Sequence, residues 1–200
     1  VDPSRFLNNP KKIAAVSAMP SRLELNDRLI HCAVTEAIVQ RYRARCVKVV
    51  EYWDLMEEVI NAMINGVEMT FGANGCMRTA KDKIWMPNGL PMNYLGISRS
   101  NGEASYFDGR KRVKIHGPKL TENTTQCLHR IIVAGQMLEI AEVLKVGLMR
   151  HDDVVCVVPD EAAEAAFEFM GQAMVKVPPW ATGLPMASEG KIGQCLLDVK

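Results

Sequence analysis

The sequence predicts an α+β fold in which long helices precede and follow a strand-rich middle segment. Apolar residues recur at helical spacing over residues 24–65 and again over 120–144. Between them, residues 67–118 are rich in Gly, Asn and Pro and contain short runs typical of antiparallel strands. The hydrophobic content of 48% and the charged content of 24% are ordinary for a globular chain of 200 residues. The chain can therefore bury a core and form one domain or two small ones.

Net charge, cysteine spacing and hydropathy argue against several classes of protein. The formal net charge is +1, so binding to nucleic acid would need a local basic patch. The six cysteines form no C-x-x-C pair and have no His cluster nearby, which favours reduced core thiols in a cytoplasmic protein over a zinc site. No run of 18 apolar residues is present, and the first residues lack the pattern of a signal peptide, so no membrane span is expected.

Two helices are predicted in the N-terminal part. Ser21–Glu24 fits a capping box at the start of a helix that runs to about Arg45. A second helix follows over residues 47–65 and ends at Gly66, which suits a C-cap. The first helix carries an apolar stripe at Ile30, Val34, Ala37, Ile38 and Tyr42.

The middle segment is predicted to form a meander or a pair of hairpins. Turn residues at Pro87–Gly89 and Ser100–Gly102 separate the strand candidates. These strands are expected at Val67–Phe71, Lys83–Met86, Met92–Ile97, Ala104–Phe107 and Arg112–His116.

A long helix over about 120–144 comes next, with Thr121 or Asn123 as its cap. Two strands, a helix opening at Pro159 and a last short strand complete the prediction, at Lys145–Arg150, Val154–Val158, 159–174 and Leu184–Ala187.

The polar tripeptide His151-Asp152-Asp153 joins the two apolar strands after the long helix, as in a hairpin. Asp is common in tight turns, so turn chemistry alone is one explanation. The other is metal binding, because Mg²⁺ is a hard cation that accepts one or two carboxylates together with substrate phosphates. Two such ions about 3.5–4 Å apart stabilise the attacking and leaving oxygens of an in-line displacement.

Two further stretches are candidates for contacting nucleic acid. The run Arg110–Lys119 holds the densest group of cations, either as a solvated strand face or as a contact to phosphates. The following helix opens with polar residues, of which Asn123 and Gln126 can bond to base edges. A helix cap explains Asn123 equally well but does not require Gln126.

Several stretches, taken in order from about residue 24, resemble the C-terminal part of family A DNA polymerases, the bacterial repair polymerase and its phage relatives. His151-Asp152-Asp153 resembles motif C of that family, usually His-Asp-Glu between two strands. The other similar stretches are Lys119–Gln126 (the palm helix before motif C, in its phage form), Thr35–Arg43 with Tyr52-Trp53 (helices of the fingers) and Pro185–Gly193 (the closing segment).

The resemblance implies a palm-like antiparallel sheet with a motif C hairpin packed on long helices, plus a helical remnant of the fingers. Residues 1–65 would be the fingers remnant and residues 66–200 the C-terminal part of the palm. Because residues 1–65 would lack their natural packing partner, exposed apolar surface is expected there.

The resemblance also implies roles for individual residues. Asp152 would bind a catalytic Mg²⁺, and Asp153, which stands where the family has Glu, would support that metal. These two are the catalytic candidates. His151 would lie near the primer terminus and Gln126 in the duplex minor groove. The remaining residues expected to contact DNA are Asn123, Arg130, Lys119 and Arg112.

The sequence departs from the family in what it lacks. No Asp-Tyr-Ser type motif supplies the family's other metal-binding Asp, and no fingers helix carries Arg, Lys and an aromatic on one face. The chain would therefore hold only half of a two-metal cage. The missing half is expected from an N-terminal polymerase fragment, in the same polypeptide or in another.

The expected function is thus part of a DNA-directed DNA polymerase that acts on primer-template DNA and deoxynucleoside triphosphates in the cytoplasm, or in the host cytoplasm if phage-encoded. One alternative is a non-catalytic DNA-binding or interaction remnant that keeps the palm fold. Another is an unrelated α+β metal-dependent hydrolase, which would need further His or carboxylate residues at ligand spacing.

Overall fold

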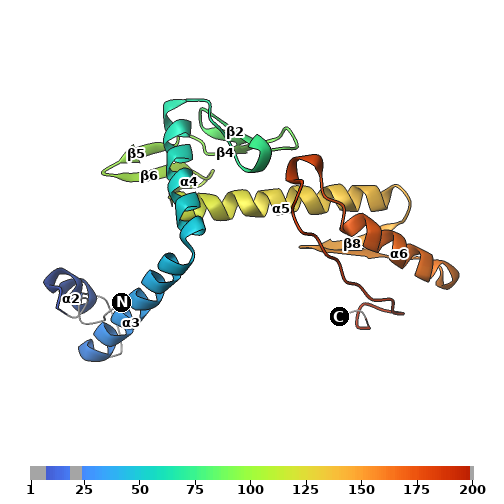
Figure 1. The fold of residues 1–200 in the computed structure, drawn as a ribbon, viewed down its shortest axis with the longest axis horizontal. Helices are drawn as coiled ribbons and strands as arrows, with labels where there is room; N and C mark the ends of the chain where they lie inside the picture. The colour runs from blue at the N-terminus through green and yellow to red at the C-terminus, as the bar shows by residue number, and fades with distance from the viewer. Residues whose placement is uncertain (1–7, 19–23, 199–200) are drawn as a thin grey trace. The chain divides into compact units, whose positions relative to one another are not determined.

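The structure, a computed structural model, describes residues 8–18 and 24–198 of the chain. Its helices and short antiparallel strands form a mixed α+β fold, as the sequence predicts (Figure 1). The chain divides into two compact units, Val1–Leu55 and Met56–Lys200. This division falls inside a single helix, α4 (Val47–Asn65), rather than at residue 65 where the composition changes.

The first unit contains helices α2 (Pro10–Ser17) and α3 (Leu25–Arg45). The side chain of Asn9 caps α2 by accepting two backbone N–H groups, at 3.1 and 3.3 Å. The two helices pack together and bury Val16 and Ala33.

Helix α3 matches the predicted helix, but its capping box begins at Ser21, outside the described residues. The helix starts at Leu25, and the side chain of Glu24 makes no capping hydrogen bond. Most of its predicted apolar stripe is exposed, at Ile30, Val34, Ile38 and Tyr42. The expectation of exposed apolar surface in this part of the chain is therefore confirmed.

Helix α4 has the predicted bounds and the predicted end. Gly66 follows it with a φ of +68°, a left-handed conformation that glycine adopts without a Cβ penalty. The next amide, Val67 N–H, donates to Ala62 O at 2.9 Å and so closes the helix. The C-terminal half of α4 is buried through Met56, Val59, Ile60 and Met63.

The middle segment forms two separate antiparallel meanders. The first sheet has the order β1-β2-β3-β4, with strands at Thr70–Phe71, Met77–Ala80, Lys83–Trp85 and Pro91–Asn93 and a 3-10 turn η1 at Ala73–Gly75. The second has the order β5-β6-β7, with strands at Ser98–Ser100, Glu103–Phe107 and Arg112–Ile115.

Sequence patterning did not predict β2 and β5. β5 is fully exposed and entirely polar, and β2 is only four residues long with the polar Thr79 at a buried position. Each is held by its neighbour in the ladder, so strand pairing rather than hydrophobic alternation defines them.

Helix α5 (Gly117–Ala141) begins three residues before its predicted start. Neither Thr121 nor Asn123 caps it; the backbone N–H of Gly117 instead donates to Oε1 of Glu57 on α4, at 2.6 Å. The other oxygen of Glu57 accepts a bond from Arg99 on β5, at 3.1 Å. Pro118 lies in the first turn, where its missing N–H has no partner to lose. A distant carboxylate thus takes the place of a local cap.

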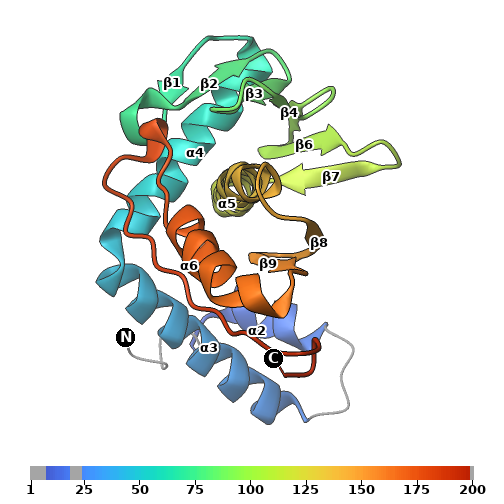
Figure 2. The same cartoon turned by 90° about the vertical axis from the view of Figure 1, so that its right-hand side faces the viewer.

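The C-terminal part packs on the second half of α5. The strands β8 (Val146–Arg150) and β9 (Asp153–Cys156) form a two-stranded sheet of their own, and α6 (Ala163–Met174) follows the 3-10 turn η2 (Asp160–Ala162). Both the hairpin and α6 contact α5, and Figure 2, which looks along α5, shows them beside it.

The segment after α6 contains no strand at Leu184–Ala187, so that prediction is wrong. After a short 3-10 turn, η3 (Pro179–Ala181), the chain runs irregularly along α6. Ser188 Oγ donates to Gly171 O at 3.2 Å, and a Cβ added at Gly190 would lie 2.9 Å from the ring of Phe167. This segment is held by close packing against α6 and not by hydrogen bonds to a neighbouring strand.

All six cysteines are free, as predicted, but five are half-buried and Cys195 is exposed. The expected core thiols are thus only partly buried, and Cys195 lies at the surface. Burial raises the pKa of Cys76, Cys127 and Cys156 above the usual value of a thiol. A raised pKa leaves less thiolate, so these three sulfurs are poor nucleophiles.

Glu57→Ala should destabilise the second unit, because it removes the acceptor of both Gly117 N–H and Arg99. We expect the free energy of unfolding, measured by urea titration with far-UV circular dichroism, to fall by about 1–3 kcal/mol. The matched control is the neighbouring exposed Glu58→Ala, which should change it by less than about 0.5 kcal/mol. Equal effects of the two substitutions would contradict the capping role.

Candidate metal and nucleic-acid site

The predicted hairpin is present, with His151 and Asp152 as its two turn residues. β8 and β9 pair in register, so that Arg150 lies opposite Asp153 and Met149 opposite Val154. His151 has a φ of +52°, which is uncommon outside glycine but tolerated by His, Asn and Asp in tight turns. The same conformation occurs at Asp82 and Asn101 in other turns of this chain, so by itself it identifies a turn and not a function.

The two carboxylates stand next to each other at the tip of this hairpin. Asp152 and Asp153 are both exposed. Among the described residues, neither side chain takes part in a hydrogen bond or an ion pair. Adjacent negative charges repel each other, so this arrangement gains from a bound cation. Carboxylate oxygens are the ligands that Mg²⁺ takes in proteins.

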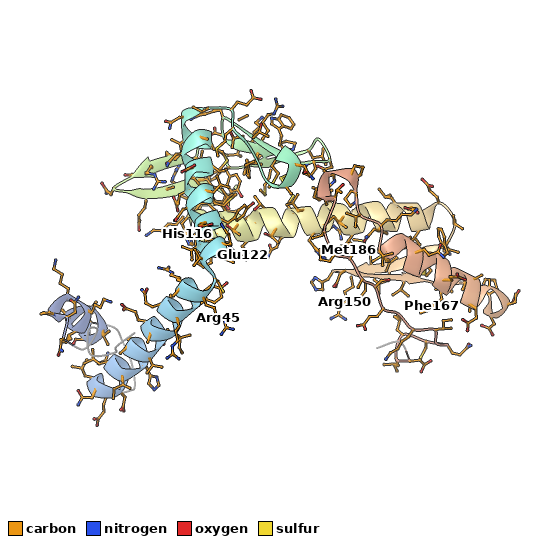
Figure 3. All side chains as sticks on the ribbon, in the orientation of Figure 1. Arg45, His116, Glu122, Arg150, Phe167 and Met186 are labelled. Atoms are coloured by element: carbon orange, nitrogen blue, oxygen red, sulfur yellow. The ribbon has the colours of Figure 1, made fainter. Side chains whose placement is uncertain are left out.

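The supporting helix α5 brings Arg130 to the hairpin. Its Nη1 donates to the sulfur of Met149, at 3.7 Å, and α5 packs on β8. Of the side chains on α5 expected to contact DNA, Arg130 is the one bonded to this hairpin. Arg150, which the sequence analysis did not single out, lies at the end of β8 directly before the turn and is exposed (Figure 3). Its position before His151 was the signal available in the sequence.

Lys119 and Gln126 share a single carboxylate on the exposed face of α5. Lys119 Nζ pairs with Glu122 Oε2 at 2.8 Å, and Gln126 Nε2 donates to Glu122 Oε1 at 3.4 Å. Figure 3 shows Glu122 near the N-terminal end of the helix. All three side chains are exposed, so these contacts are weak and easily exchanged for a phosphate or a base.

Asn123 has a structural partner. Its Nδ2 donates to the hydroxyl of Tyr94, at 3.1 Å, and that ring is 2% exposed and packs edge-on against Tyr106 with 4.9 Å between centroids. Burial raises the pKa of Tyr94 to about 12, although the bond from Asn123 works in the opposite direction. Asn123 therefore satisfies a buried hydroxyl and ties α5 to the loop after β4.

The basic run is partly used inside the second meander. Arg112 donates to Ser98 Oγ at 2.7 Å, to Ser105 O at 2.9 Å and to Gly96 O at 3.1 Å. Lys114 pairs with Glu103 at 2.7 Å across the same sheet. These contacts fit the interpretation of a solvated strand face. Any contact between Arg112 and a phosphate would use the part of its side chain that remains exposed.

The described residues do not bring a third metal ligand to Asp152 and Asp153. Within 8–18 and 24–198, no group of three or more His, Cys, Asp or Glu is arranged to hold a metal ion. Two carboxylates suit the hard character of Mg²⁺ but fill only part of its octahedral shell. The remaining ligands would come from water, from phosphates or from another segment.

Compared with protein-family models, with curated proteins and with solved structures, the chain has no significant match. The resemblance to family A polymerases thus rests on the stretches named above. In the part of the chain that the structure describes, no helix has the length and apolar character needed to cross a membrane.

Tyr94 should titrate late, because burial raises its pKa to about 12. Between pH 10 and 12 the unfolded chain loses this proton while the folded chain keeps it. The stability that depends on the neutral ring is present below about pH 10 and lost as the pH rises toward 12. A phenolate absorbance titration should show one late step that Tyr94→Phe removes and Tyr42→Phe preserves.

Asp152→Asn and Asp153→Asn should leave folding almost unchanged, because neither carboxylate has a described partner. We expect each to shift the free energy of unfolding by less than about 0.5 kcal/mol in urea titration. A loss above about 2 kcal/mol would mean that these residues stabilise the hairpin, and turn chemistry would then explain them.

Proposed function

We propose that this chain is part of a DNA-directed DNA polymerase of family A type and supplies one half of its two-metal site. The observation that carries the proposal is the pair Asp152 and Asp153 at the tip of the β8–β9 hairpin, exposed and with no described protein partner. A pair of unneutralised carboxylates on a rigid turn is an arrangement that a divalent cation and an approaching phosphate would both stabilise.

The reaction is nucleotidyl transfer to a primer 3′-hydroxyl. The 3′-hydroxyl gives up its proton to water and its oxygen attacks the α-phosphorus of a deoxynucleoside triphosphate. A new phosphorus–oxygen bond forms while the bond between the α-phosphorus and the oxygen bridging to the β-phosphate breaks, and pyrophosphate leaves with that oxygen. Bound Mg²⁺ would stabilise the charge that develops on these oxygens. The hairpin's part is to hold its two carboxylates where the metal and the triphosphate meet.

The side chains of α5 would orient the nucleic acid. Gln126 is an exposed donor and acceptor on the same helix that supports the hairpin. Arg130 contacts the hairpin itself, through its bond to the sulfur of Met149 on β8. A cation in that place attracts phosphate without cancelling the metal site, because the guanidinium bonds to a sulfur and not to Asp152 or Asp153.

In this proposal an N-terminal polymerase segment completes the site, and the described residues bring no third ligand to the two carboxylates. The same observation favours a second candidate function, a non-catalytic DNA-binding or interaction remnant with this fold. It also weakens the hydrolase alternative, which needs a fuller ligand set within one chain.

The decisive experiment is complementation. The chain is mixed with an N-terminal fragment of a family A polymerase that carries the Asp-Tyr-Ser motif and the nucleotide-binding fingers helix. Primer extension is measured with Mg²⁺ and labelled primer-template DNA. Extension should require both parts, and Asp152→Ala should reduce its rate by at least about 100-fold, because losing a metal ligand removes electrostatic stabilisation of the transition state.

The matched control is Asp160→Asn, an exposed acid in η2 shortly after the hairpin, which should leave extension unchanged. Binding of the two parts is followed separately by sedimentation. Association and DNA binding without extension would support the non-catalytic remnant. Full extension by the Asp152→Ala mixture would overturn the proposed metal site.

A further inference from the structure

One face of α3 is largely apolar and exposed, whereas the opposite face packs against α2. Ala33 is 2% exposed and Glu36 pairs with Lys12 of α2, so α2 covers one side of the helix. On the other side Ile30, Val34, Ile38 and Tyr42 are 51, 48, 63 and 48% exposed, and the ring of Tyr42 also stacks on Trp53 of α4 with 6.3 Å between centroids. At 3.6 residues per turn these four occupy an arc of about 120°. We call them the α3 stripe.

Two opposite charges lie in the middle of this arc, one at each end of the helix. Asp27 is in the first turn of α3 and Arg45 in the last. Five helical turns separate them, so they project in the same direction as the centre of the α3 stripe. Figure 3 shows Arg45 at the C-terminal end of the helix. The stripe is therefore acidic at its start and basic at its end, with the four apolar side chains between them and with His31 and Arg41 inside the same arc.

We infer that the α3 stripe is a dimer interface and that its occupant is the same stripe of a second copy of this chain, running antiparallel. A two-fold axis at the level of residue 36 makes the stripe complementary to itself. Four pairings follow from this one axis: Asp27 with Arg45, Ile30 with Tyr42, Val34 with Ile38, and His31 with Arg41 of the other copy.

The charges of Asp27 and Arg45 favour the antiparallel direction. In the antiparallel pair each Asp27 meets an Arg45, so both ends of the interface carry an opposite-charge contact. A parallel pair would place Arg45 against Arg45 and Asp27 against Asp27. The same residue contacts occur twice, as a closed two-fold interface requires.

The dimer should be weak. A helix of 21 residues is about 32 Å long, and a single helix pair of that length buries less than the ~1,600 Å² of a standard interface. The dimer does not depend on polymerase activity, because α3 and the β8–β9 hairpin belong to different compact units.

The test is sedimentation velocity of the full chain over about 10–500 µM, a range suited to micromolar dissociation constants. The wild-type chain should pass from monomer to dimer. Ile38→Asp should abolish the dimer, since it buries a charge at the interface. Circular dichroism should show unchanged helix content, because Ile38 is largely exposed in the single chain.

A charge exchange tests the pairing itself. Asp27→Arg or Arg45→Asp alone puts like charges at both ends and should raise the dissociation constant at least about tenfold. The double variant D27R/R45D should recover it to within about threefold. An equal mixture of the two single variants should form a heterodimer, because each then meets its opposite.

Arg43→Asp is the matched control. It makes the same charge change about 160° around the helix from Arg45 and should not affect the dimer. A wild-type chain that stays monomeric across the range would overturn the inference, including the case where another part of the same chain covers the stripe. A dimer whose dissociation constant does not change on substitution of Asp27 or Arg45 would overturn the inference as well.

Discussion

The carboxylate of Glu57 is the interaction on which the second unit depends. One oxygen accepts the first amide of α5, and the other accepts Arg99 of the second meander. Arg99 also bonds to Asn61 on α4 and to Gly102 O in its own hairpin turn. A single side chain thus joins a helix, a sheet and the start of the next helix. A negative charge at a helix N-terminus is also favoured by the helix dipole.

Helix α5 connects that junction to the candidate site. Its first half is held by Asn123 on the hydroxyl of Tyr94. Its second half is held by the buried Gln136, whose Nε2 donates to Met174 O at the end of α6 and to Lys176 O just after it. Between these two fixed regions Arg130 reaches the hairpin. The position of the two carboxylates is therefore set by contacts along the whole helix, although the carboxylates themselves take part in none of them.

The residues that stabilise the second unit are different from the residues of the candidate site. The polar groups that hold the unit together are paired and partly buried, at Glu57, Tyr94 and Gln136. The groups proposed to meet metal and nucleic acid are exposed and weakly engaged, at Asp152, Asp153 and Gln126. Such a division lets the site bind ligands without loosening the fold. The exposed α3 stripe belongs to the other compact unit.

The sequence alone determined the features that are encoded locally. Helical periodicity and Gly66 defined α4 to the residue, the spacing of apolar side chains defined the α3 stripe, and two apolar runs around His151-Asp152-Asp153 defined the hairpin. Tertiary structure decided what depends on partners distant in the chain. The cap of α5 comes from 60 positions away, so no local pattern could reveal it. Asn123 had two local interpretations, and only the fold showed that its amide faces the buried Tyr94. β5 carries no apolar signal, because its pairing with β6 alone makes it a strand.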